Sequence, residues 1–135
     1  MKKLLSFKNL ILFLLIIFLI ESCEKEENQF IGRWHGTTTR VTYFNNDKLI
    51  EDTLLSNVNR AYEFFKQGNG NMYFIGDLQS TFTWEVKNNT LVFNWDDNTT
   101  TKYDYSISST ALTLKNEIEH QSNYRLIYES FYIRE

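Results

Sequence analysis

The chain has 135 residues but only one cysteine, Cys23, and no proline. A single cysteine cannot form a disulfide within the chain, so buried side chains and backbone hydrogen bonds must hold the folded part together. Proline lacks the N–H group that a central strand needs, so its absence leaves every strand interior free to pair. These two absences favour a domain of unbroken β-strands without covalent cross-links.

The motifs of common enzymes and metal sites are missing as well. His35 and His120 are far apart, and neither has a second ligand at the spacing of a zinc or iron site. The sequence contains no nucleophile elbow, no phosphate-binding glycine loop and no dinucleotide fingerprint. Asp96 and Asp97 are adjacent acids, but acids between two strands usually form a turn rather than a catalytic pair. We therefore expect no enzyme activity, no metal and no cofactor.

Basic clusters are absent too, and the formal net charge is −3 at pH 7. Proteins that bind nucleic acid neutralise its phosphates with clustered lysine and arginine side chains, so we expect no nucleic-acid partner. What the chain does have is aromatic side chains, which make up 16% of its residues. Each large ring can bury roughly 150–250 Å² in a core.

The N-terminal segment differs in composition from the rest of the chain. Lys2, Lys3 and Lys8 lie before or beside an unbroken apolar run over residues 10–20. That run is too short to cross a bilayer as a helix, which takes about 20 residues, but it has the length of the apolar part of a signal peptide. The alternative is an uncleaved membrane anchor beside an incidental cysteine.

Residues 20–23, Ile-Glu-Ser-Cys, follow this run directly. A small residue before a lone cysteine at this point resembles the lipobox of bacterial lipoproteins, although Glu21 departs from the usual pattern. The resemblance implies that residues 1–22 are a signal peptide, that the chain is cut before Cys23, and that lipid such as palmitate attaches to its thiol. Cleavage removes three lysines and one glutamate, so the remaining 113 residues carry a net charge of −5.

Lys25, Glu26 and Glu27 follow the cysteine closely. A lysine and two acids at this position resemble the surface-export signal of lipoproteins from the Bacteroidetes group. The resemblance implies an outer-membrane protein whose membrane partner is reached through the lipid on Cys23 and whose domain faces the cell exterior. The alternative is a solvated, charged linker. In both cases we expect residues 23–29 to form an extended tether.

After the tether the sequence predicts β-strands and no helix. Apolar and polar residues alternate over residues 81–86 and 90–95, and Asn88 and Asn89 between them suit a type I′ turn. Residues 48–59 are ambiguous between a strand and a helical turn, and we favour a strand. Further strands are predicted at residues 34–44, 61–66, 72–75, 102–107, 112–114 and 124–134.

Eight or nine short strands with short connections imply antiparallel neighbours in meander order. Such strands can stack as a sandwich or close into a barrel, and only closure leaves no exposed edge. We therefore expect residues 30–135 to form an all-β domain, folded as a small antiparallel up-and-down β-barrel.

Several short motifs in this domain resemble those of a known family. Residues 32–34, Gly-Arg-Trp, at the start of the first predicted strand resemble the Gly-x-Trp motif of lipocalins. Residues 62–65, 82–86 and 89–93 then follow in the order typical of lipocalin-like domains in Bacteroidetes lipoproteins. The resemblance implies a lipocalin-like barrel.

The same resemblance implies roles for particular residues. Gly32 would turn the chain into the barrel, and Trp34 would plug its closed end. A late arginine would pack over that tryptophan. Arg125 and Arg134 both fit this position, and the sequence does not choose between them.

Six aromatic residues on the predicted strands are candidates for the wall of a ligand pocket. If they line a cavity, the domain can hold a small ligand, for which pockets usually exceed about 300 Å³. If the rings fill the barrel instead, no such pocket remains. The sequence supports the two alternatives equally. The six residues are Phe64, Phe82, Trp84, Phe93, Trp95 and Tyr103.

Residues 52–54, Asp-Thr-Leu, resemble the three-residue O-glycosylation signal that Bacteroidetes use on exported proteins. The resemblance implies a sugar on Thr53 and a surface position for that residue. Both implications agree with an exported, cell-surface domain.

Together these patterns predict a lipid-anchored, lipocalin-like module that binds a small apolar or amphipathic ligand. The alternative is a protein-interaction or inhibitor module with a filled barrel. Such a module should expose an apolar or aromatic patch of several hundred Å².

Overall fold

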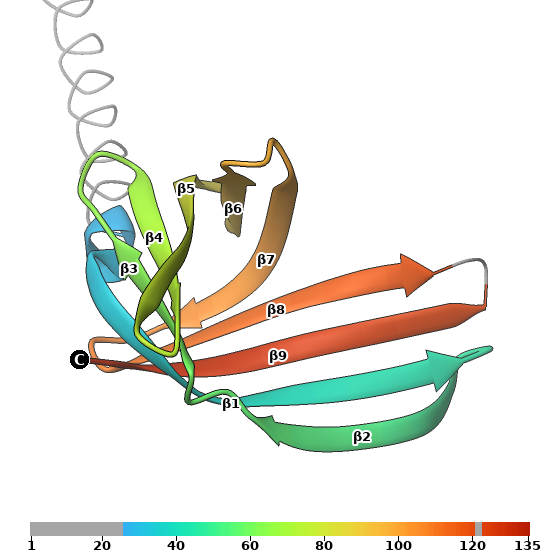
Figure 1. The fold of residues 1–135 in the computed structure, drawn as a ribbon. Coiled ribbons are helices and arrows are strands. Elements are labelled where there is room, and N and C mark those ends of the chain that lie inside the picture. The colour runs from blue at the N-terminus through green and yellow to red at the C-terminus, as the bar shows by residue number, and fades with distance from the viewer. Residues whose placement is uncertain (1–25, 121–122) are drawn as a thin grey trace, which may run out of the picture. The chain divides into compact units, whose positions relative to one another are not determined.

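The computed structural model describes residues 26–120 and 123–135, so the predicted signal peptide, Cys23 and Lys25 lie outside the described residues. Ile31–Glu135 form one compact unit, separate from the residues before it, and this unit contains nine β-strands (Figure 1). The strands are β1 (Gly32–Asn45), β2 (Lys48–Ser56), β3 (Arg60–Phe64), β4 (Asn69–Phe74), β5 (Asp77–Lys87), β6 (Thr90–Trp95), β7 (Thr100–Ile107), β8 (Ala111–His120) and β9 (Tyr124–Arg134).

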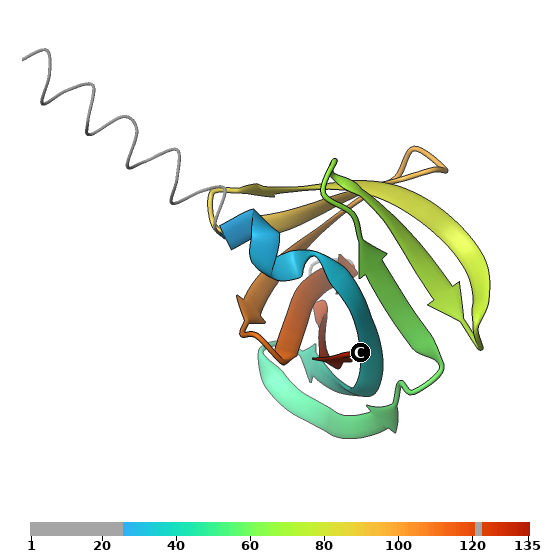
Figure 2. The same cartoon turned by 90° about the vertical axis from the view of Figure 1, so that its left-hand side faces the viewer.

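Eight of these strands close into an antiparallel barrel. β1 and β3 to β9 are neighbours in chain order. β9 then pairs with β1, from Trp34 opposite Arg134 to Asn45 opposite Tyr124, and completes the ring. Figure 2 shows the strands encircling the interior, seen from the side where the C-terminus lies. The predicted all-β fold, a small lipocalin-like barrel, is therefore confirmed.

The ninth strand, β2, lies outside the ring because β1 is longer than the barrel wall. Residues 32–35 of β1 pair with β3, whereas residues 38–45 pair on the same edge with β2. Likewise, only residues 112–115 of β8 pair with β7, while β8 continues beside β9 to His120. The ambiguous residues 48–59 thus contain a strand, as we favoured.

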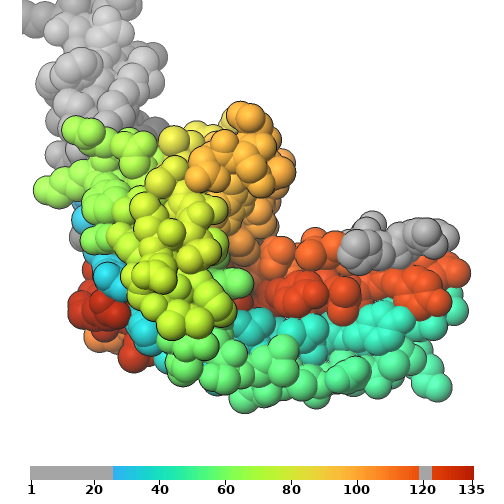
Figure 3. Space-filling view, in the orientation of Figure 1, coloured from blue at the N-terminus to red at the C-terminus, as the bar shows by residue number. Residues whose placement is uncertain are grey.

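As a result, β2, β1, β9 and β8 continue past the barrel rim as a four-stranded antiparallel sheet, which we call the extension. It runs to the right of the barrel in Figure 1. The space-filling view shows an open corner between the barrel and this sheet (Figure 3). One wall of the barrel is therefore much taller than the others.

Turns with left-handed residues join several of the strands. Asn88 and Asn89 have φ angles of 51° and 57°, which are the positive values that a type I′ turn requires at both central positions, as predicted. Asn46 and Asp47 adopt φ angles of 50° and 59° between β1 and β2. The turn between β4 and β5 differs, because there a β-branched residue, Ile75, has a φ of 54°.

The prediction of an extended tether is wrong for its last part. Residues 26–30 form a short helix instead. Glu26 and Glu27 lie in its first turn, where negative charge is favourable beside the free N–H groups. Phe30 at its end is fully buried. The charge pattern that predicted a linker is therefore equally compatible with one turn of helix.

Candidate functional site

The barrel is closed at the end where β1 begins, and the fully buried Trp34 lies there. The guanidinium of Arg134 lies over the indole ring. Arg134 also donates hydrogen bonds to the carbonyls of Ile31 and Ser109. Gly32 has a φ of 119°, and a Cβ added to it would lie 3.1 Å from Nη1 of Arg134. Gly32 and Trp34 thus lie where the lipocalin resemblance places a turn and a plug.

The structure also distinguishes the two late arginines. Arg134 packs over Trp34, whereas Arg125 lies on the extension. The guanidinium carbon of Arg125 is 4.6 Å from the ring centroid of Phe44, and its Nε is 3.4 Å from Oε1 of Glu117. The arginine of the closed end is therefore Arg134.

The six aromatic residues predicted as pocket walls contact one another inside the barrel. The rings of Phe82 and Phe93 stack with centroids 4.3 Å apart, and the ring of Phe64 meets Trp84 edge-on at 5.3 Å. Tyr103 lies 5.1 Å from Phe93. These rings fill much of the interior, and of the six only Tyr103 borders the pocket at the barrel mouth. A ligand-binding role for the other five stays a prediction.

A pocket of about 240 Å³, which we call the mouth pocket, lies where the barrel opens onto the extension. Arg60 and Tyr62 of β3, Tyr103 of β7 and Tyr132 of β9 line one side of it. The other side comes from the tall wall of β1, β8 and β9. Its residues there are Thr39, Leu114, Asn116, Ile118, Tyr128 and Ser130.

Our sequence analysis missed Arg60. This residue begins β3 and precedes Tyr62 and Phe64 by two and four positions. Because side chains alternate along a strand, all three lie on the same, inward face. An arginine in phase with the core residues of a barrel strand is the signal that could have found it.

The three tyrosines around Arg60 are neutral at physiological pH. Burial raises the pKa of Tyr62 well above its usual value, raises that of Tyr103 to about 12, and raises that of Tyr132. Burial by itself lowers the pKa of Arg60, but the neighbouring tyrosines outweigh this effect, so the net shift of its pKa is upward. The mouth pocket therefore combines one permanent positive charge with three neutral hydroxyl groups.

No acidic side chain pairs with Arg60 in the part of the chain that the structure describes. By contrast, Arg33 lies 3.1 Å from a carboxylate oxygen of Glu135, and Arg40 lies 3.4 Å from one of Asp52. Arg60 instead lines the mouth pocket beside the neutral side chains of Tyr62, Tyr103 and Tyr132. Its charge is thus solvated by neutral groups and is not neutralised by them.

The mouth pocket continues onto one face of the extension, which we call the inner face. Strand register places Val41 beside Tyr128, and Tyr43 beside Leu126. The rings of Tyr43 and Tyr124 stack at 6.0 Å with an angle of 8° between their planes. Alternation along β1, β9 and the described part of β8 puts no charged side chain on this face, whereas the edge strand β2 adds Glu51 opposite Tyr43 and Lys48 opposite Asn45. Next to the mouth pocket this face is therefore uncharged and rich in tyrosine, and its charged side chains lie at the edge strand.

The opposite face of the extension carries two ion pairs. Arg40 pairs with Asp52 across β1 and β2, and Arg125 pairs with Glu117 across β9 and β8, both at 3.4 Å. This face therefore meets the solvent. The two faces of the extension thus differ, and the tyrosine-rich one faces the barrel mouth.

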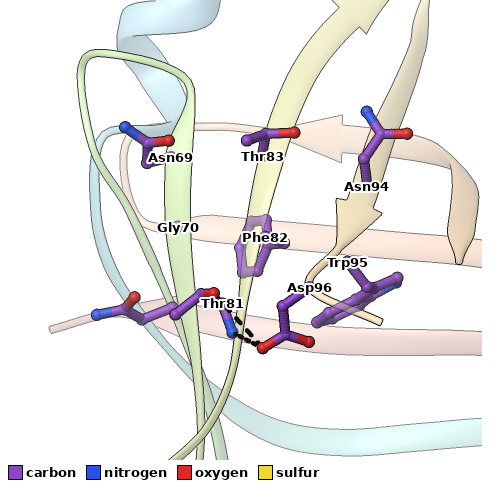
Figure 4. Close-up of a pocket in the computed structure, with 9 residues that line it drawn as sticks. Asn69, Gly70, Thr81, Phe82, Thr83, Asn94, Trp95 and Asp96 are labelled. Carbon is purple, nitrogen blue, oxygen red and sulfur yellow. Dashed lines mark hydrogen bonds between the residues drawn. The ribbon is translucent and has the colours of Figure 1, made fainter. Parts of the chain in front are cut away.

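A larger hollow, of about 440 Å³, lies over β4, β5 and β6, and its lining combines amide and hydroxyl side chains with two of the predicted wall residues, Phe82 and Trp95 (Figure 4). Oδ2 of Asp96 accepts a hydrogen bond from the backbone N–H of Thr81 at 3.0 Å. In the adjoining turn, hydrogen bonds from the hydroxyl and N–H of Thr99 lower the pKa of Asp97. Both acids thus lie in the turn between β6 and β7, as the sequence predicted, and Asp96 also joins this turn to β5.

Other predicted features have less structural context. Thr53 lies half-buried on the outermost strand, β2, and its hydroxyl donates a hydrogen bond to Glu51 at 2.7 Å. Its glycosylation stays a prediction.

Among the described residues, no three His, Cys, Asp or Glu side chains are grouped to hold a metal ion. Nor does this part of the chain contain a helix long and apolar enough to cross a membrane.

Comparisons with models of known protein families, with curated proteins and with solved structures found no match to this chain. The lipocalin-like fold is therefore established by its strand pairing. Membership of a family stays a prediction from the motifs around Gly32 and Trp34.

Proposed function

We propose that this protein is a lipid-anchored, lipocalin-like module of the cell surface that binds a small amphipathic ligand at the barrel mouth. The observation that supports this most is that a pocket with a charged group and hydroxyls is continuous with a surface rich in aromatic side chains. Half-buried Arg60 and three tyrosine hydroxyls lie in the mouth pocket, and the part of the inner face that β1, β9 and the described part of β8 form, which carries no charge, adjoins them. A ligand with one polar group and one apolar part complements both regions at once.

The size of the pocket limits how such a ligand can bind. A volume of about 240 Å³ is below the roughly 300 Å³ of usual ligand pockets. Aromatic rings occupy the interior beyond it, with Phe93 and Leu91 fully buried. The polar group would therefore enter the mouth pocket, while the apolar part would lie along the inner face.

The anchor suits a ligand that arrives from outside the cell. The chain would leave the membrane at a lipidated Cys23 and enter the domain at Gly32, which lies at the closed end of the barrel. The mouth pocket opens at the other end. This arrangement would leave the mouth accessible to the medium.

Nuclear magnetic resonance can test the proposal on the soluble chain that begins at residue 23 and carries Cys23→Ser. We expect added octanoate or octanol to shift the backbone amide signals of Ile118 and Tyr128 at the mouth. The signal of Trp34 at the closed end should not move. No shift at the mouth with either compound would refute ligand binding at this site.

Two neighbouring residues provide a matched pair of variants. Leu126 lies on the inner face and Ile127 on the outer face, and both are half-buried. We expect Leu126→Asn to weaken octanol binding at least about fivefold, since it removes roughly 1 kcal/mol of apolar contact. Ile127→Asn should leave the affinity unchanged. Equal effects of the two variants would show that the inner face is not used.

A protein-binding role is the second candidate, and exposed apolar residues favour it. Leu54 on the edge strand β2 is 62% exposed, and Ile75 at the tip of the β4–β5 hairpin is 68% exposed. Large exposed apolar side chains often mark interaction surfaces. A partner that the wild type captures, and that Leu54→Lys and Ile75→Lys lose without any change in octanol affinity, would support this role.

A further inference from the structure

Resting on the proposed function, we infer that the ligand of the mouth pocket is a monoanion: a carboxylate with an apolar tail, bound through the Arg60 guanidinium. The hydroxyls of Tyr62, Tyr103 and Tyr132 would complete the site, since all three line the pocket beside Arg60. The inference concerns the charge of the ligand, which the amphipathic surface alone does not determine.

The first argument is the unneutralised charge. A cation withdrawn from water is costly unless an opposite charge or several hydrogen bonds compensate it. In the described chain Arg33, Arg40 and Arg125 all have carboxylate partners, whereas half-buried Arg60 has none. A ligand carboxylate would supply the missing charge, and a neutral or cationic ligand would not.

The second argument is the set of available donors. The guanidinium fork of an arginine matches the two oxygens of a carboxylate. The rings of Tyr62 and Tyr132 lie 5.3 Å apart and Tyr103 lines the same pocket, so the three hydroxyls are grouped next to Arg60. Because each hydroxyl rotates freely and keeps its proton at neutral pH, the group can turn its donors toward an incoming anion.

The single positive charge of Arg60 and the volume of the mouth pocket favour a carboxylate over a phosphate monoester. A phosphate monoester carries about −1.5 to −2 at neutral pH, which one arginine cannot balance. The pocket of about 240 Å³ corresponds to roughly eight water volumes. That space suits a carboxylate and the first part of its tail, and the rest of the tail would contact Leu126 and Tyr128 on the inner face.

Calorimetric titration of the soluble chain with octanoate, octanol and octylammonium tests the inference, because the three probes share a tail and differ in charge. We expect octanoate to bind at least about tenfold more tightly than octanol, since hydrogen bonds to a charged group contribute roughly 1.5–3 kcal/mol. Octylammonium should bind more weakly than octanol. Arg60→Gln should weaken octanoate binding about tenfold and change octanol binding less than about twofold.

Arg40→Gln is the matched control, because Arg40 lies on the charged outer face and pairs with Asp52. It should preserve the preference for octanoate. Equal affinities for octanoate and octanol, or tighter binding of octylammonium, would overturn the inference and leave the proposed function intact. If none of the three probes binds, the proposed function itself fails. The comparison of probes on the wild type remains decisive even if Arg60→Gln does not fold.

Discussion

The guanidinium of Arg134 lies over the indole of Trp34, with Cζ 4.3 Å from the ring centroid. The two residues face each other across β9 and β1, near the last and first positions of the barrel. The same guanidinium donates hydrogen bonds to the carbonyls of Ile31, at 2.6 Å, and Ser109, at 2.8 Å. One side chain therefore joins the entry of β1, the β7–β8 turn and the end of β9.

Replacing this arginine should destabilise the barrel. We expect Arg134→Ala to lower the free energy of unfolding by about 2–4 kcal/mol, through the lost charge-assisted hydrogen bonds and cation–π contact. Urea unfolding followed by tryptophan fluorescence measures this. Arg125→Ala is the control and should cost only about 1 kcal/mol, because Arg125 has a similar cation–π contact with Phe44 and an exposed ion pair with Glu117 in place of the two hydrogen bonds to backbone carbonyls. Similar losses in both variants would mean that Arg134 has no special role.

Ile75 offers a route to a more stable protein. It is 68% exposed and has a φ of 54°, a conformation that is costly for a β-branched residue. We expect Ile75→Asn to raise the free energy of unfolding by about 1 kcal/mol, because asparagine tolerates this conformation. Leu78→Asn, exposed on the same hairpin but with ordinary backbone, should change stability by less than about 0.5 kcal/mol. A loss of stability in Ile75→Asn would reveal a stabilising contact of the isoleucine.

The local features of this fold were predictable, because they are encoded in short stretches of sequence. Alternating residues such as those of β5 and β6 specified strands, and the Asn88-Asn89 pair specified a turn. The hairpin at Ile75 was not predictable, since isoleucine is a poor turn former and residues 72–75 read as strand. Here the pairing of β4 with β5 imposes the turn on an unsuitable residue.

The extension and the mouth pocket depend on long-range geometry and could not be derived from the pattern. Nothing in residues 48–56 indicates that they pair only with residues 38–45 of β1. That limit arises because β3 pairs with residues 32–35 on the same edge of β1. Likewise, Arg60 meets Tyr103 and Tyr132 only after the ring closes. The aromatic residues were predicted to lie inside, but their mutual packing was left open.

High pH should destabilise the domain through the tyrosines of the mouth pocket. Burial raises the pKa of Tyr103 from 10.0 to about 12, so between these values the unfolded chain loses the proton while the folded chain keeps it. This contribution to stability is fully present below pH 10 and is lost as pH rises toward 12. We expect the titration of Tyr103 alone to lower the free energy of unfolding at pH 11 by about 1 kcal/mol. Tyr103→Phe should reduce the pH dependence, and an unchanged slope would show that Tyr103 is not shielded from water.

Membrane attachment should depend on Cys23 alone. If lipid on this thiol and the new N-terminus anchors the protein, Cys23→Ser will leave no acyl acceptor and the chain should be lost from the membrane fraction. Each buried CH₂ contributes roughly 0.8 kcal/mol and one chain holds only marginally, so stable anchoring needs more than one chain or a further signal. The barrel should remain folded in this variant, because Cys23 precedes β1 by nine positions. Its Arg60-dependent binding of octanoate should therefore persist.

Fractionation combined with mass spectrometry of the mature N-terminus measures the outcome. We expect the wild type to begin at Cys23 and to carry acyl groups, while Ser22→Ala, which keeps a small residue before the cysteine, should behave as the wild type does. A mature chain that still contains residues 10–20, or a Cys23→Ser variant that stays in the membrane, would identify the apolar run as an uncleaved anchor. In that case the cysteine would be incidental, and the uncleaved apolar run would itself attach the protein to the membrane.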